Sequence, residues 1–441
     1  AIGTPEKQDI QLTIDAALQV ELQNEMPGYV EQIFPTGKDN LVRMSAVILD
    51  AENGDLLTSA VYPLPDYDIL EQESNSAASQ GVPFVYNDQN RPEGWRAFSD
   101  IDLGLRFPSH PGSTAKIMSA MAGYMSEGRE AISSQMYRVL YEQTTAKTER
   151  TGKMYETADS VNINRAFVWS SNCYFINLVN DKGLYDELKT IYGAVGVSVN
   201  GERPYVLSYR ECSTEWGNLV LGESSDAMAK YGRYVALYSN NEEKTRYESQ
   251  FRSSVKNNLW RMNNRLAHDI WNWAWGQGGL DATPLAMARA ASIVANDGDM
   301  PVTRYLLSDE KDYIHIYDSF DNDSLRSLMK QESRYHSGFS EPYVGGKTGT
   351  AERVLRTEEV LKDDGSVYVK VLEKPNDAWY VCFVEDVNVR RVQNGIETME
   401  PTKLAIAVRI ERAGNLYSSA AKNFVKDRIL PILRESGYIV E

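Results

Sequence analysis

Strand-like apolar segments near both ends of the chain enclose a long stretch with helical periodicity, and this order limits the available folds. Residues 44–62 hold two apolar runs around Asn53-Gly54, which predicts a two-residue β-hairpin. Residues 377–386 and 402–412 have the composition of buried strands. Between them, apolar residues recur at helical spacing with glycine and polar breaks. We therefore predict an α+β fold in which both ends of the chain build one sheet.

The predicted architecture has two lobes: an antiparallel sheet flanked by helices and an inserted all-helical lobe. Residues 1–112 and 341–441 would form the two parts of the sheet lobe, and residues 113–340 the helical lobe. A site would be expected in a cleft between the lobes. Smaller features are a helix capped by Asp15, a hairpin around Asp364-Gly365 and a closing helix over 418–435.

Composition excludes several classes of function. The chain has 441 residues and a formal net charge of −16, so a nucleic acid would be repelled. Its three cysteines are isolated and its four histidines scattered, which argues against a disulfide framework, a zinc site or any metal cofactor. No apolar run is long enough to cross a bilayer. Because the chain begins without methionine, we expect a processed or truncated chain whose targeting segment is missing.

The first candidate site is "HPGSTAKIM", residues 110–118. Ser113 and Lys116 are three positions apart, so on a helix that begins at Pro111-Gly112 they share a face. A serine needs a neighbouring base to act as a nucleophile, and the lysine amine can be that base when it is neutral. Taken alone, the motif fits Ser113 better as an ordinary N-cap.

Two further segments carry polar groups suited to acyl transfer. In "WSSNCYF", Ser170 and Asn172 would project from one end of a turn and could relay a proton and orient a lysine. In "GGKTGTAE", residues 345–352, Lys347 offers a cation and two threonines offer hydroxyls. The glycines of this segment let another backbone approach, and an edge strand of this kind can bind an extended peptide. Taken alone, each segment fits a structural role better: a polar patch on an amphipathic helix for the first, and a glycine-rich turn entering a strand for the second.

The three motifs occur together and in the order found in penicillin-binding proteins, which share two of them with serine β-lactamases. Over about residues 9–435 the chain resembles the transpeptidase domain of a penicillin-binding protein. The matching segments include "PGSTAKI", "SSN", "KTGTAE", "DIQLTIDAALQ", "VILDAENGDLL" and "DAWYVCFV". Gly276-Gln277-Gly278 and Thr283-Pro284 resemble the monofunctional, class B type. The resemblance implies the penicillin-binding/β-lactamase-like fold.

The resemblance also implies a serine-type D,D-transpeptidase that cross-links peptidoglycan stem peptides. Ser113 would attack the carbonyl of the penultimate D-alanine, and Lys116 would take its proton. Ser170 would pass a proton to the departing D-alanine, while Asn172 orients Lys116 and the substrate. A second strand's amine would then resolve the acyl-enzyme, and β-lactam antibiotics would be trapped at Ser113.

The Lys-Thr-Gly segment would bind the substrate carboxylate. Lys347 would hold Ser170 and supply positive potential, and Thr348, Gly349 and Thr350 would contact the ligand. The backbone N–H groups of Ser113 and Thr350 would form the oxyanion hole. The resemblance further implies a domain at the extracytoplasmic face of the bacterial cytoplasmic membrane, in cell-wall synthesis for shape or division, with a membrane glycan polymerase as a partner.

Several alternatives share these motifs. A serine β-lactamase needs an activated water; Glu211, Glu215 and Glu223 lie in the relevant region but in no recognisable motif. A D,D-carboxypeptidase would use water as the acceptor. A non-catalytic sensor or scaffold would bind β-lactams or peptidoglycan without turnover. Ala115 and Ile117 stand where the family often has Phe and Pro, which predicts a reshaped wall beside Ser113.

Overall fold

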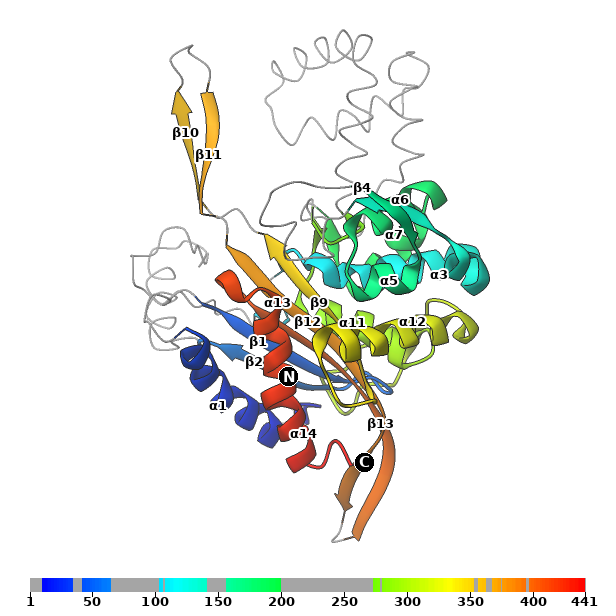
Figure 1. The fold of residues 1–441 in the computed structure, drawn as a ribbon. Coiled ribbons are helices and arrows are strands. Elements are labelled where there is room, and N and C mark those ends of the chain that lie inside the picture. Colours follow the sequence, from blue (N-terminus) through cyan, green and yellow to red (C-terminus); the bar gives the residue numbers. More distant parts are fainter. Residues whose placement is uncertain are drawn as a thin grey trace, which may run out of the picture.

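The core of the protein is one five-stranded sheet formed by both ends of the chain (Figure 1). The computed structural model describes residues 10–34, 42–64, 103–105, 108–140, 156–199, 273–277, 280–352, 356–361, 367–373, 375–393 and 396–440. The strand order is β2-β1-β13-β12-β9, and every neighbouring pair is antiparallel. The strands are β1 (Met44–Asp50), β2 (Leu56–Tyr62), β9 (Val344–Glu352), β12 (Asn376–Gln393) and β13 (Ile396–Ile410). The predicted α+β class and the sheet built from both chain ends are confirmed.

Both faces of this sheet are buried, and successive residues of a strand serve different faces. In β12, Val381 and Phe383 belong to one hydrophobic cluster, whereas Tyr380 and Cys382 belong to the other. The second cluster lies under α1 (Ala16–Ile33), α13 (Ser418–Phe424), the π-helix η5 (Val425–Ile429) and α14 (Leu430–Glu435). Burial on both faces explains why these strands are continuously apolar instead of alternating.

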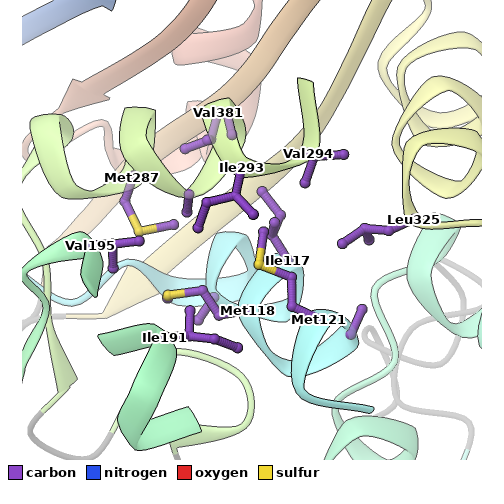
Figure 2. Close-up of a cluster of buried hydrophobic side chains, with 14 of the residues drawn as sticks. Ile117, Met118, Met121, Ile191, Val195, Met287, Ile293, Val294, Leu325 and Val381 are labelled. Carbon is purple, nitrogen blue, oxygen red and sulfur yellow. The ribbon is translucent and has the colours of Figure 1, made fainter. Parts of the chain in front are cut away.

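The first cluster joins the sheet to the helices that carry the candidate motifs. Figure 2 shows its centre, where Ile117 and Met121 of α3 (Lys116–Ser134) meet Ile293 of α11 (Pro284–Ala295) and Val381 of the sheet. Around them lie α5 (Ile163–Val168), α6 (Asn172–Lys182), α7 (Tyr185–Val195) and α12 (Ser319–Gln331), which continues into the π-helix η3 (Glu332–Ser337). The start of α3 is thereby fixed against the sheet.

Short elements complete the fold. The helix η2 (Gly112–Ala115) precedes α3, and η4 (Gly414–Leu416) precedes α13. Four two-stranded sheets pair β3 (Tyr137–Leu140) with β4 (Glu156–Val161), β5 (Ser198–Val199) with β6 (Leu280–Asp281), β7 (Asp299–Pro301) with β8 (Tyr313–His315), and β10 (Arg356–Leu361) with β11 (Val367–Glu373). The last pair confirms the predicted hairpin after Glu352; its tip lies outside the described residues.

Two local predictions need correction. The β1–β2 connection is longer than a two-residue turn, because β1 ends at Asp50 and β2 begins only at Leu56. Asp50 closes this loop: its backbone carbonyl accepts from Gly54 N at 3.0 Å and its carboxylate from Glu52 N at 2.9 Å. The helical pattern over 163–181 is broken after Val168: α5 ends there, and a new helix begins at Asn172 with Ser171 as its N-cap. Asp15 does cap α1, since it accepts from the N–H groups of Ala17 and Leu18.

Several sequence features lie outside the described residues. These are most of the predicted loop over 66–106, the weakly periodic stretch 224–268, and Cys212. In the ranges that are described, no helix combines the length and apolarity needed to span a membrane.

Candidate active site

Ser113 and Lys116 meet at the start of α3. Lys116 Nζ donates to Ser113 Oγ at 2.9 Å, as the three-residue spacing predicts. Ser113 lies within η2 and does not cap a helix, because neither η2 nor α3 has a side-chain cap. The interpretation of Ser113 as an N-cap is therefore wrong.

A strained turn brings the second motif to the same lysine. Ser170 lies between α5 and α6 with φ of 60°, a conformation that is uncommon for a residue other than glycine. Ser171 caps α6 by accepting from Tyr174 N at 3.3 Å, which fixes the beginning of that helix. Backbone strain of this kind persists where the surrounding structure enforces it, and it clusters at functional sites.

Lys116 is the centre of the site. Its Nζ lies within hydrogen-bonding distance of Ser170 Oγ (3.0 Å), the Ser170 carbonyl oxygen (2.6 Å) and Asn172 Oδ1 (2.6 Å). The lysine is fully buried, and its Nζ lies 5.9 Å from the centre of the Phe175 ring. A neutral amine in this position could accept a proton from one serine hydroxyl and return one to the other.

Three backbone segments pack without side chains between them beside Ser113. A Cβ atom on Gly276 would lie 2.0 Å from the Gly112 carbonyl oxygen, and Gly112 N donates to Gly276 O at 3.0 Å. A Cβ atom on Gly112 would lie 2.4 Å from the Thr350 carbonyl oxygen, and one on Gly349 would lie 2.8 Å from the Pro111 carbonyl oxygen. These glycines let β9 approach the segment that carries Ser113.

The Lys-Thr-Gly motif lies on β9, at an edge of the five-stranded sheet. Lys347 is fully buried, and its Nζ lies 5.8 Å from the centre of the Phe167 ring on α5. Thr348 is 5% exposed, whereas Thr350 is partly exposed. The structure therefore brings the residues of the three motifs to one region between α3, α5, α6 and β9.

Sequence reasoning missed Glu332, a fully buried carboxylate in η3. Its Oε1 accepts from Thr348 Oγ1 at 2.7 Å and from Thr348 N at 2.9 Å, and it lies 3.4 Å from Lys347 Nζ. The available signal was indirect: a lysine in a strand that is buried over most of its length needs an acidic partner. Nothing in the sequence points to the one among 62 acidic residues that supplies it.

Burial and charge act in opposite directions on Lys347. Desolvation lowers the pKa of Lys347 from its ordinary value, while the charge of Glu332 and its hydrogen bond oppose that change. The ion pair therefore favours a protonated Lys347 in a place where an isolated ammonium group would be disfavoured.

Two predictions concern the surroundings of the site. Ala115 and Ile117 are fully buried in the first hydrophobic cluster, and Figure 2 shows Ile117 there; that they reshape the wall beside Ser113 stays a prediction. The glutamates considered for a β-lactamase, Glu211, Glu215 and Glu223, lie outside the described residues. Across the described ranges, no group of three or more His, Cys, Asp or Glu side chains could hold a metal ion.

Comparisons with known proteins give a consistent result. The family model described as "Penicillin binding protein transpeptidase domain" matches residues 44–395. Penicillin-binding protein A from Mycobacterium tuberculosis has a similar structure, with a TM-score of 0.53 and 16% identity over 95% of this chain and 80% of that one. Its ceftriaxone acyl-enzyme complex gives a TM-score of 0.55 and 16% identity, over 97% of this chain and 79% of that one.

A second similar structure is the apo transpeptidase domain of penicillin-binding protein 3 from Burkholderia pseudomallei. It gives a TM-score of 0.54 and 13% identity over 99% of both chains. At these identities the likeness shows the fold. No curated protein matches the sequence at a significant level.

Proposed function

Because the chain belongs to the penicillin-binding protein transpeptidase-domain family, we propose that it is a D,D-transpeptidase that cross-links peptidoglycan stem peptides through an acyl-enzyme at Ser113. The observation that carries the proposal is the position of Lys116, whose Nζ contacts Ser113, Ser170 and Asn172 together. This contact set joins two motifs that are 54 residues apart or more in sequence.

In the acylation step, Ser113 Oγ attacks the carbonyl carbon of the penultimate D-alanine, and its proton passes to a neutral Lys116. The 2.9 Å contact between these residues supports direct transfer. The negative charge that develops on the carbonyl oxygen would be stabilised by the N–H groups of Ser113 and Thr350. The close approach of Gly112 to the Thr350 carbonyl supports their proximity.

Collapse of the tetrahedral intermediate breaks the peptide bond. Ser170 Oγ, 3.0 Å from Lys116 Nζ, would give its proton to the departing D-alanine nitrogen and recover one from Lys116. This returns Lys116 to the neutral state, ready for the second half of the reaction. The amine of a second stem peptide then attacks the Ser113 ester and loses a proton to the same base. The bond to Ser113 Oγ breaks, Lys116 returns the proton to that oxygen, and the new amide bond is the cross-link.

Lys347 and Thr350 would recognise the terminal carboxylate of the donor peptide. Lys347 supplies a fixed positive charge, and the partly exposed Thr350 can donate a hydroxyl. Thr348 was also predicted to bind the carboxylate, but its hydroxyl donates to Glu332 and would have to turn first. The edge position of β9 suits main-chain pairing with an extended peptide.

The proposal extends to β-lactams and to the place of action. A β-lactam carries an acylating carbonyl and a carboxylate, so it would acylate Ser113 and remain bound. The domain would act on the extracytoplasmic side of the cytoplasmic membrane, where peptidoglycan is assembled, beside a membrane glycan polymerase that supplies the strands.

A fluorescent penicillin tests this function. We expect a covalent band on a denaturing gel that persists for many minutes after free drug is removed. Ser113→Ala should abolish the band, while Ser134→Ala, at the exposed far end of the same helix, should leave it unchanged. A band that disappears within seconds would indicate a β-lactamase.

Product analysis with a stem-peptide donor and an amine acceptor separates the remaining alternatives. Transpeptidation predicts D-alanine release together with a cross-linked product. Release without that product would indicate a carboxypeptidase. Stable acylation by penicillin with no D-alanine release would indicate a sensor or scaffold.

A further inference from the structure

Lys347 of the Lys-Thr-Gly strand forms an ion pair with Glu332, a buried carboxylate to which the proposed chemistry gives no role. Glu332 is fully buried, and both of its oxygens are hydrogen-bonded: Oε1 to Thr348 and Oε2 to Ser337 Oγ at 2.9 Å. A carboxylate is rarely buried to this extent unless its charge is paired. Here the charge partner is Lys347, 3.4 Å away and itself fully buried.

The local backbone places this carboxylate at the strand. Where α12 ends, the chain widens into the π-helix η3, and it then turns at Gly338, which has φ of +74°. A widened turn of this type is frequently found at functional sites. Glu332 is its first residue and reaches the backbone N–H of Thr348. One side chain therefore sets the position of two consecutive residues of the motif.

The pair is also connected to the reacting residues. Lys347 Nζ stands over the ring of Phe167, on the helix that ends just before the strained Ser170 turn. A hydroxyl has one proton, and that of Thr348 is committed to Glu332 at 2.7 Å. Glu332 thus fixes the direction of the Thr348 donor as well as the charge beside it.

We propose that Glu332 is a positioning residue of the active site, which keeps Lys347 as a fixed cation and holds Thr348 in register so that β9 can receive the carboxylate of the ligand. The inference rests on the proposed function and adds to it a residue outside the three motifs. Glu332 acts through Lys347 and Thr348 and does not itself touch the ligand.

The charges around Lys347 agree with the proposal that Glu332 keeps this lysine protonated. Desolvation lowers the pKa of Lys347, and Glu332 opposes that change. Other titratable groups also face Glu332. Desolvation and the cations Lys347 and Lys422 lower the pKa of His336, and desolvation lowers the pKa of Lys422.

From β12, Tyr380 and Cys382 face the same carboxylate. Burial raises the pKa of both groups, which therefore stay neutral around neutral pH. Glu332 consequently supplies negative charge beside the amines of Lys347 and Lys422.

Glu332→Gln tests the proposal by removing the charge while keeping the shape. The measured quantity is the rate constant for acylation of Ser113 by a fluorescent penicillin across pH. We expect a fall of about tenfold or more at neutral pH, and a shift of the alkaline limb of the profile by about 1–3 units to lower pH. The sign follows because a Lys347 without its counter-charge loses its proton at lower pH. Glu332→Asp, which keeps the charge, should keep that limb near its original pH.

Glu385→Gln is the matched control. Glu385 is a buried carboxylate that pairs with Arg326 at 2.8 Å and Lys330 at 2.7 Å, both on the helix that leads into η3. Its substitution should lower the thermal stability of the same region while the acylation rate per folded molecule and its pH profile stay unchanged. An unchanged profile in Glu332→Gln, or an equal change in Glu385→Gln, would overturn the inference.

Two further comparisons keep the test decisive. If Glu332→Gln does not fold, Lys347→Met is compared with the Lys347→Met/Glu332→Gln double variant, in which both charges are absent. Because Lys347 is missing from both variants, removing Glu332 should no longer shift the alkaline limb of the acylation profile, and a shift that persists in this background would overturn the proposal. If the unmodified protein is not acylated at Ser113 at all, the proposed function itself fails, and this inference with it.

Discussion

Asn172 Oδ1 lies 2.6 Å from Lys116 Nζ, although the two residues are 56 positions apart in the sequence. Asn172 is the first residue of α6, and the Ser171 cap fixes that end of the helix. The amide oxygen can only accept, so it orients a Lys116 N–H and leaves the lone pair of the neutral amine free to face a serine hydroxyl. The relationship makes Asn172 the part of the site that defines where the proposed base stands.

Asn172→Ala should slow acylation of Ser113 by about 100-fold, because a small displacement of the base disrupts the reacting geometry. The matched control is Asn162→Ala, which removes the side-chain cap of α5 and should cost about 1 kcal/mol of stability without changing the acylation rate of the folded protein. Stopped-flow measurement with a chromogenic β-lactam gives both rates. Equal rates in the two variants would contradict the orienting role of Asn172.

Gly276→Ala should destabilise the protein and impair acylation together. The new Cβ would lie 2.0 Å from the Gly112 carbonyl oxygen, and the residue has φ of +85°. Gly183→Ala is the control, because Gly183 has φ of +65° with nothing within 4 Å of its Cβ position. Both variants incur about 1–2 kcal/mol of backbone strain, and only Gly276→Ala adds overlap of about 1–3 kcal/mol.

Urea unfolding and penicillin acylation would be measured on both glycine variants. We expect Gly183→Ala to lose stability while its folded fraction acylates normally. If Gly276→Ala did the same, the close packing of Gly276 on Gly112 would have no part in shaping the site.

The sequence predicts that strands from both chain ends form one sheet, because strand and helix patterns are local and repeat over many residues. The apolar strands near both chain ends and the helical period between them each extend over many residues. The pairing of Ser113 with Lys116 was equally predictable, since i,i+3 spacing on a helix brings side chains together.

What the sequence did not reveal depends on contacts between distant segments. The helix break at Ser170 is enforced by packing against Lys116, and helical periodicity on both sides conceals it. Glu332 resembles any charged residue on the polar end of an amphipathic helix until the fold buries it. The Gly276 contact likewise depends on a loop from the helical part meeting Gly112.

We expect the contact between Glu341, just before β9, and Arg434 of α14 to weaken in acid. Its Oε1 accepts from Arg434 Nη2 at 2.9 Å. Partial burial raises the pKa of Glu341, but the hydrogen bond and charge of Arg434 outweigh it and hold that pKa below its ordinary value. Between the folded-state pKa and the unfolded value of about 4.3, the folded state therefore binds fewer protons than the unfolded state.

The stabilisation from Glu341 is thus present above that pH and is lost as the pH falls through the folded-state pKa. Glu341→Gln should lower the free energy of unfolding by about 0.5–1 kcal/mol at neutral pH, and this difference should shrink in acid. Glu400→Gln, at an exposed position of β13, is the control with no expected effect. A Glu341→Gln deficit that stays constant down to pH values below the folded-state pKa would contradict the assignment.

Ser170→Ala and its neighbour Ser171→Ala separate proton transfer from helix capping. Ser170 Oγ contacts Lys116 Nζ at 3.0 Å, whereas Ser171 Oγ accepts from the backbone of α6. We expect Ser170→Ala to reduce D-alanine release by about 10²–10⁴-fold with little loss of stability, because it removes the group proposed to protonate the leaving nitrogen. Ser171→Ala should instead cost about 1 kcal/mol of stability and keep the rate of the folded protein. A reversed pattern would move the proton relay from Ser170 to Ser171, and a lost rate in both would show that the turn acts through its shape alone.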